Sequence, residues 1–248
     1  MRILRWLKRF QKHDKLPIDI RRIESVIGYH FNDPFLLYRS LKHRSYSQTR
    51  EGSIDLSNER LEFLGDSVFN MVVAHAVFDE NKDFQEGELT KLKSMLVSKM
   101  SAAIAARNAG IDRFLLLSDS EEDAGGRDRT SIIADTYEAV IGAIFLDGGL
   151  KAARAFIQKT ILNETDIILG KIQENYKSVL LELMQAKKLG HPTYNTLTEE
   201  GPDHDKVFTV QVSIKGKSLS IGKGKNKKAA QQMAAKECLE KLYRENIF

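Results

Sequence analysis

Acidic side chains inside an apolar stretch are the first feature of this sequence that could do chemistry. The stretch NERLEFLGDSV contains Glu59, Glu62 and Asp66, and over residues 61–78 the last two are the only charged side chains. On a helix the three acids fall within about 60° of each other, opposite an apolar face. Such a group is usually a solvent-facing stripe, but solvent-facing stripes usually include lysine or arginine. We therefore expect a mostly buried helix whose acids have a function.

The same pattern occurs a second time, in RTSIIADTYEAVIGAIFLD, where Asp135 and Glu138 are the only charged side chains of residues 130–146. Burying unpaired carboxylates is costly, so these acids must be protonated, paired with distant basic residues or bound to a cation. If the two acid faces meet, four carboxylates converge. A hard divalent cation with oxygen ligands, Mg²⁺ first, would satisfy them. Structural acids that share a proton or a salt bridge are the alternative.

Two other kinds of catalytic site lack their residues. A di-iron bundle needs Glu-x-x-His pairs, and no acid lies three residues before any of the six histidines. A nucleophilic serine site needs a G-x-S-x-G turn, which is absent, and the single cysteine, Cys238, lies in the basic C-terminal region.

The elements that must position the acids are helices. Apolar residues at three- and four-residue spacing predict an all-α domain over residues 18–168. The charged, glycine-rich segment 118–129 predicts a loop. The DGG sequence at Asp147 predicts the end of one helix before another over 151–161, and 169–174 is expected to be a linker.

The pattern changes after the linker, and an α+β domain is expected over residues 175–245. VFTVQVSI alternates as a strand does, and the last helix is rich in alanine. The predicted order is α-β-β-β-α, with helix 176–188, strands 192–199, 207–214 and 217–222, and helix 227–243.

Charge is distributed unevenly along the chain. The net charge is +6 for residues 1–22, −7 for 23–170 and +5 for 171–248. A basic C-terminal third beside an acidic middle suggests that one part holds a polyanion. Four lysines lie near the start of the last helix, where backbone N–H groups also attract anions. Few aromatic residues accompany them for base stacking, so binding to the backbone of a duplex is favoured over binding to single-stranded nucleic acid. These lysines are Lys223, Lys225, Lys227 and Lys228.

Length and composition suit a cytoplasmic protein of two domains without a membrane anchor. The chain has 248 residues and one cysteine, which fits a reducing compartment. No apolar run approaches the roughly 20 residues that span a bilayer. Residues 1–17 are expected to be a basic, solvated extension, although MRILRWLKRFQKHDK could also be an amphipathic targeting or membrane-surface helix.

Several of these segments, in this order, resemble bacterial ribonuclease III. They are HRSY, NERLEFLGDSV, LVSK and GGRDRTSIIADTYEAVIGAIFLD, while GHPTY, GPDHDKVFTV and KKAAQQMAAK are similar to a double-stranded-RNA-binding domain. The likeness covers nearly the whole chain from about residue 20. It implies a helical endonuclease domain followed by an RNA-binding domain. A non-catalytic RNA-binding dimer on the same scaffold is the alternative.

The resemblance also implies roles for the acids. Glu62, Asp135 and Glu138 would bind the divalent ion, Mg²⁺ or as a substitute Mn²⁺, and no small-molecule cofactor is expected. Asp66 and Glu138 would be catalytic, with Asp66 orienting the attacking water, and Glu59 would have a supporting role. A homodimer would cut both strands of an RNA duplex, leaving 5′-phosphate and 3′-hydroxyl ends with short 3′ overhangs. Ribosomal, messenger and transfer RNA precursors would be its substrates.

RNA contacts in the C-terminal domain are implied in the same way. Ser178 and Glu182 on its first helix and His204 in a loop would lie on the minor groove, and the four lysines would bind phosphates. Two positions depart from the family pattern: Leu181 stands where glutamine is frequent, and Asp119 where lysine is common.

Overall fold

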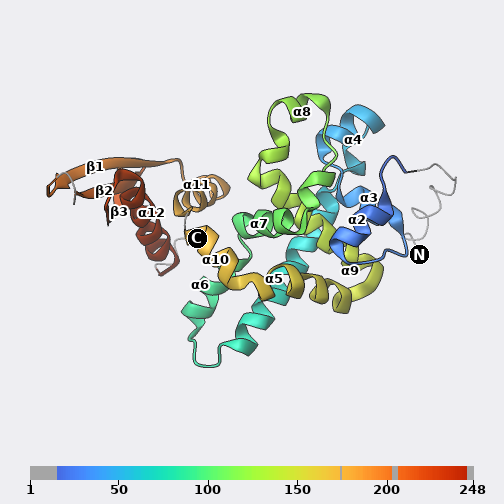
Figure 1. The fold of residues 1–248 in the computed structure, drawn as a ribbon, viewed down its shortest axis with the longest axis horizontal. Coiled ribbons are helices and arrows are strands. Elements are labelled where there is room, and N and C mark those ends of the chain that lie inside the picture. Colours follow the sequence, from blue (N-terminus) through green and yellow to red (C-terminus); the bar gives the residue numbers. More distant parts are fainter. Residues whose placement is uncertain (1–15, 174, 203–205, 245–248) are drawn as a thin grey trace.

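The computed structural model describes residues 16–173, 175–202 and 206–244, and it has a helical first domain and a smaller tail domain (Figure 1). Residues 1–15 of the expected N-terminal extension lie outside the described residues, as does His204. The first domain contains α2 (Ile20–Ile27), α3 (Pro34–Ser40), α4 (Arg44–Glu51), α5 (Glu59–Glu80), α6 (Glu86–Leu96), α7 (Lys99–Ala109), α8 (Asp119–Asp123), α9 (Thr130–Thr160), α10 (Thr165–Gln173) and the 3₁₀ helices η2 (Ile54–Leu56), η3 (Ile111–Phe114), η4 (Gly126–Asp128) and η5 (Leu162–Glu164).

The helices α5 and α9 cross in direct backbone contact in the first domain. A Cβ on Gly65 of α5 would lie 1.7 Å from the carbonyl oxygen of Glu138, and a Cβ on Gly142 of α9 would lie 2.2 Å from that of Leu61. Only glycine fits at these two positions. Since Gly65 follows Glu62 by three residues and Gly142 follows Glu138 by four, this crossing brings the acids of the two helices together.

The expectation of a mostly buried α5 is wrong for one face. Leu61 and Val68 are buried, but Phe63 is 78% exposed, and Met71 and Phe78 are exposed as well. Among the described helices, α5 is the one with the length and apolar composition to span a membrane, a test that core helices of soluble proteins also pass. The absence of a membrane anchor therefore stays a prediction.

The long helix α9 is buried around nearly its whole circumference from Ile132 to Ile144. It kinks at Gly149, where φ is 74° and the backbone is not helical, so the predicted break after DGG is confirmed. Just before the kink, Asp147 accepts hydrogen bonds from the Tyr29 hydroxyl at 2.7 Å and from the Asp33 N–H at 2.9 Å. These bonds anchor the N-terminal helices to α9.

Two segments expected to be irregular contain helices. Segment 118–129 includes α8 and η4, because Ser118 caps α8 by accepting from the Glu121 N–H. The segment expected to be a linker is mostly helical, since α10 continues to residue 173 and buries Ile168 and Ile172. A packed helix thus leads into the tail domain.

The tail domain has the order α-β-β-β-α, as predicted. Its antiparallel sheet has the strand order β1-β2-β3, and α12 packs against β2 and β3. The alternation in VFTVQVSI is confirmed, because Val210 and Val212 are fully buried. The elements are α11 (Tyr176–Ala186), β1 (Pro192–Glu200), β2 (Val207–Ile214), β3 (Lys217–Gly224) and α12 (Lys227–Arg244).

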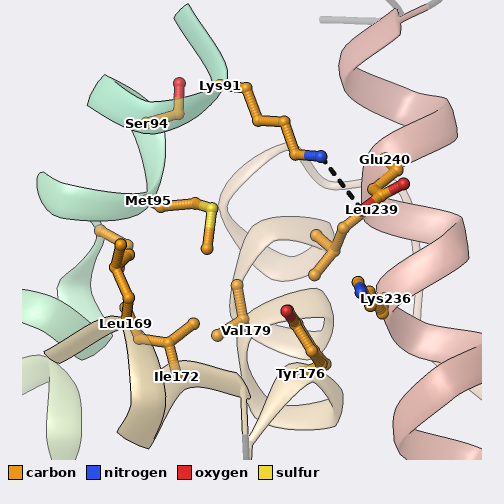
Figure 2. Close-up of a pocket in the computed structure, with 11 residues that line it drawn as sticks. Lys91, Ser94, Met95, Leu169, Ile172, Tyr176, Val179, Lys236, Leu239 and Glu240 are labelled. Atoms are coloured by element: carbon orange, nitrogen blue, oxygen red, sulfur yellow. Dashed lines mark hydrogen bonds and ion pairs between the residues drawn. The ribbon is translucent and has the colours of Figure 1, made fainter. Parts of the chain in front are cut away.

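A cavity of about 290 Å³ lies where α6 and α10 meet the tail domain (Figure 2). Lys91 of α6 donates from Nζ to Glu240 of α12 at 3.0 Å across this interface. The other lining residues are mostly apolar. They are Ser94, Met95, Ser98, Leu169, Ile172, Tyr176, Val179, Lys236 and Leu239.

Candidate metal centre and nucleic-acid interface

Three of the predicted acids come together at the crossing of α5 and α9. Glu62 projects from α5, and Asp135 and Glu138 project from successive turns of α9, so that one carboxylate oxygen of each lies within 4.8 Å of the others. Glu138 is 5% exposed, and the other two are partly buried. Carboxylate oxygens that converge in this way suit a hard divalent cation such as Mg²⁺.

The surroundings disfavour negative charge in the absence of a cation. Burial, and to a smaller extent the neighbouring acids, raise the pKa of Glu138 to about 8. The same causes, burial first and then the charge of Asp135, raise the pKa of Glu62 to about 7. A divalent ion would reverse this effect, because it stabilises the charged carboxylates.

Lys99 is a basic residue of this cluster that the sequence analysis did not assign. Its Nζ donates a hydrogen bond to Oδ1 of Asp135, and its charge lowers the pKa values of Glu62 and Glu138. A signal was present in LVSK, which has a lysine beside a helix start, but nothing in the sequence connects that segment with Asp135. Of the three acids, Asp135 thus forms a salt bridge, which was the alternative to a metal site in the sequence analysis.

Asp66 and Glu59 lie outside the group of three. Asp66 is exposed one turn further along α5 and accepts a hydrogen bond from Nδ2 of Asn70 at 2.7 Å. Its charge still contributes to the raised pKa of Glu138. Glu59 is exposed at the start of α5 and forms an ion pair with Arg44 at 3.6 Å.

Of the two predicted RNA contacts on α11, Glu182 lies toward the first domain. Ser178 and Glu182 are partly buried, and the Ser178 hydroxyl donates to Asn175 Oδ1 at 3.1 Å. Burial raises the pKa of Glu182, and the charge of Lys99 opposes the rise, which places Glu182 close to Lys99. Leu181, one of the two residues that depart from the family pattern, is exposed on the same helix.

The four lysines are exposed at one end of the tail sheet. Lys223 is the last residue but one of β3, Lys225 follows the strand, and the other two begin α12. Lys227 forms an ion pair with Glu199 at 2.6 Å, so its charge is partly compensated. Asn226 accepts a hydrogen bond from the Ala229 N–H at 2.8 Å and thus occupies part of the helix N-terminus. The other departure, Asp119, lies 3.6 Å from Arg50.

Comparison with known families assigns both domains. Residues 33–165 match the model described as ribonuclease-III-like, and residues 176–242 match the double-stranded RNA binding motif. The chain belongs to the ribonuclease III family. Within this family, Ribonuclease 3 of Caldanaerobacter subterraneus subsp. tengcongensis is 43% identical over 224 residues, which cover 89% of this chain and 96% of that protein.

Other members of the ribonuclease III family agree with the assignment. Ribonuclease 3 of Protochlamydia amoebophila is 42% identical over 221 residues, covering 89% of this chain and 90% of that protein. The solved nuclease domain of ribonuclease III from Campylobacter jejuni, described as flexible in a region involved in dimer formation, is 36% identical. It aligns with a TM-score of 0.55 over 60% of this chain and 99% of its own. The first domain is therefore a nuclease domain, and the tail domain a double-stranded-RNA-binding domain.

Proposed function

We propose that this chain is an endoribonuclease that cuts double-stranded RNA with the help of a divalent cation, Mg²⁺ or as a substitute Mn²⁺. The observation that carries the proposal is the group of three converging carboxylates in a ribonuclease III domain joined to an RNA-binding domain. Its products would have 5′-phosphate and 3′-hydroxyl ends and short 3′ overhangs. Its substrates would be precursors of ribosomal and other RNAs in the cytoplasm.

Each acid has a distinct role in this proposal. Glu62, Asp135 and Glu138 would hold the cation, which when bound would supply Lewis-acid chemistry toward water and the scissile phosphate. Asp66 is exposed beside them and would hold and orient the attacking water. Glu59 supports the site through its ion pair with Arg44.

The division of charge between the domains fits this function. An acidic nuclease domain alone would repel RNA, so the tail domain supplies affinity through its exposed lysines. A domain of this type spans about 16 base pairs, mostly through the sugar-phosphate backbone. His204 and Ser178 are candidate minor-groove contacts, and Glu182 joins them once α11 is free of the nuclease domain.

A homodimer accounts for the exposed apolar face of α5. Phe63, Met71 and Phe78 lie on this helix beside the acids, and a second copy would cover them. Two copies bring two metal centres, one for each strand of a duplex.

The decisive experiment compares wild type with Glu138→Gln on a long RNA duplex with Mg²⁺. We expect cutting by wild type, and binding without cutting by the variant. Glu80→Gln, which removes an exposed carboxylate from the end of α5, is the matched control and should cut like wild type. If wild type binds the duplex but never cuts it, the chain is a non-catalytic RNA-binding protein. Equal cutting by wild type and Glu138→Gln would contradict the assigned site.

A further inference from the structure

Lys99 places a positive charge within the acid cluster. It is the first residue of α7, and its Nζ donates to Oδ1 of Asp135. Because Asp135 lies in the same group as Glu62 and Glu138, the ammonium group is close to the space where a cation would bind. The charges of all three acids stabilise its protonated form.

The position of Lys99 is unfavourable for its own helix. The N-terminus of α7 carries the positive end of the helix dipole, where a cation is destabilising and an acid would be preferred. Ser98 already caps this terminus by accepting from the Ser101 N–H. The compensating interaction for Lys99 is therefore with the acids of α5 and α9.

An ammonium group and a divalent ion cannot both use Asp135 in this way. Both are cations, and their repulsion over a few ångströms in a partly buried site is strong. The Lys99 side chain is 45% exposed and has a flexible stem, so its ammonium group can leave toward solvent without a change in the backbone.

We propose that Lys99 is a built-in counter-ion of the metal-free site and that it must leave Asp135 when the divalent cation binds. It is thus a positioning residue, which keeps the carboxylates together without metal and lowers their affinity for it. This inference rests on the proposed function, since it needs the cluster to be a metal site.

The test measures direct Mn²⁺ binding to the full chain without RNA. The electron paramagnetic resonance signal of free Mn²⁺ monitors the binding. Wild type is compared with Lys99→Met, with Lys99→Arg, which keeps the charge, and with Lys82→Met, which removes an exposed charge paired with Asp79 far from the site. We expect Lys99→Met to bind Mn²⁺ roughly three- to tenfold more tightly, because the competing ammonium group is gone. The Arg variant and the Lys82 control should stay within about twofold of wild type.

Thermal unfolding gives a second readout that does not depend on activity. In chelator, Lys99→Met should melt below wild type, and saturating Mn²⁺ should close the gap. Unchanged or weaker Mn²⁺ binding by Lys99→Met would overturn the counter-ion role. Failure of the proposed metal site looks different, because Glu138→Gln would then bind Mn²⁺ as well as wild type does.

Discussion

Gly65 of α5 lies against the backbone carbonyl of Glu138 in α9, so closely that a methyl group at position 65 would overlap the oxygen. The signature NERLEFLGDSV thus contains, besides two site acids, the glycine that lets the opposite helix approach. The proposed metal site lies where these two helix backbones are in direct contact. Packing and chemistry therefore depend on the same few residues.

Gly65→Ala should damage both stability and metal binding. The added Cβ would lie 1.7 Å from the Glu138 oxygen, so the helices must separate. We expect a loss of more than about 3 kcal/mol in the free energy of unfolding, measured by urea titration, as for severe overpacking in a core. Gly170→Ala in α10 is the matched control, because nothing lies within 4 Å of its Cβ position. That variant should be neutral or slightly stabilising, and equal losses in both variants would contradict the crossing.

The raised pKa values predict how stability depends on pH without metal. The pKa of Glu138 is about 8 in the folded protein and near 4.5 in the unfolded chain, so the unfolded state gives up its proton first. The favourable contribution of this group is complete below pH 4.5 and is lost as pH rises through 8. Glu138→Gln should therefore gain stability relative to wild type between pH 5 and 9, by something of the order of 3 kcal/mol. Urea unfolding in chelator measures it, and a pH-independent difference would refute it.

The sequence was sufficient for the fold class but not for the surfaces that join its parts. Helical periodicity and the alternation in VFTVQVSI predicted both domains, because burial of one face dictates those patterns. The convergence of Glu62 with Asp135 and Glu138 could be conjectured from two apolar segments with unpaired acids. This convergence could not be derived from the sequence, since no local pattern identifies the helix that packs against Gly65.

Three features could not be predicted from the sequence, for related reasons. Lys99 is an ordinary lysine in its own segment, and its contact with Asp135 exists only after α7 and α9 pack. The second half of α10 lies in segment 169–174, where a linker was predicted, and its helical packing could not be foreseen because the burial of Ile168 and Ile172 depends on the tertiary fold. The exposed face of α5 was predicted to be part of the core, because apolar residues at a subunit interface have the same composition as buried core residues.

Phe63→Glu should convert the expected homodimer into a monomer. Phe63 is 78% exposed on α5, and a charge at the centre of an apolar contact opposes association. Analytical ultracentrifugation should show half the wild-type mass, with the helical circular dichroism retained. Phe84→Glu, at an exposed phenylalanine between α5 and α6, is the comparison and should leave the mass unchanged. A dimeric Phe63→Glu protein would place the interface elsewhere.

The tail lysines should control the salt dependence of RNA binding. Replacing Lys225 and Lys228 together by alanine removes two exposed charges, one just before α12 and one in its first turn. The slope of log affinity against log salt should fall by roughly 2, since each phosphate contact contributes about 1. Lys217→Ala, at the opposite end of β3, should keep the wild-type slope. Filter binding on a duplex measures it, and an unchanged slope in the double variant would exclude these lysines from the interface.

Exchange of the charges of Lys91 and Glu240 tests whether the two domains dock through this ion pair. The two side chains are 3.0 Å apart and only partly exposed at the edge of a mostly apolar cavity (Figure 2). Lys91→Glu and Glu240→Lys should each destabilise the docked arrangement by creating like charges, and the double variant should recover part of the loss. We expect a coupling of about 0.5 to 1 kcal/mol in a double-mutant cycle of urea unfolding, typical of a partly exposed pair. Strictly additive effects would mean that the apolar contacts alone hold the tail domain against the nuclease domain, and that the ion pair contributes nothing to its placement.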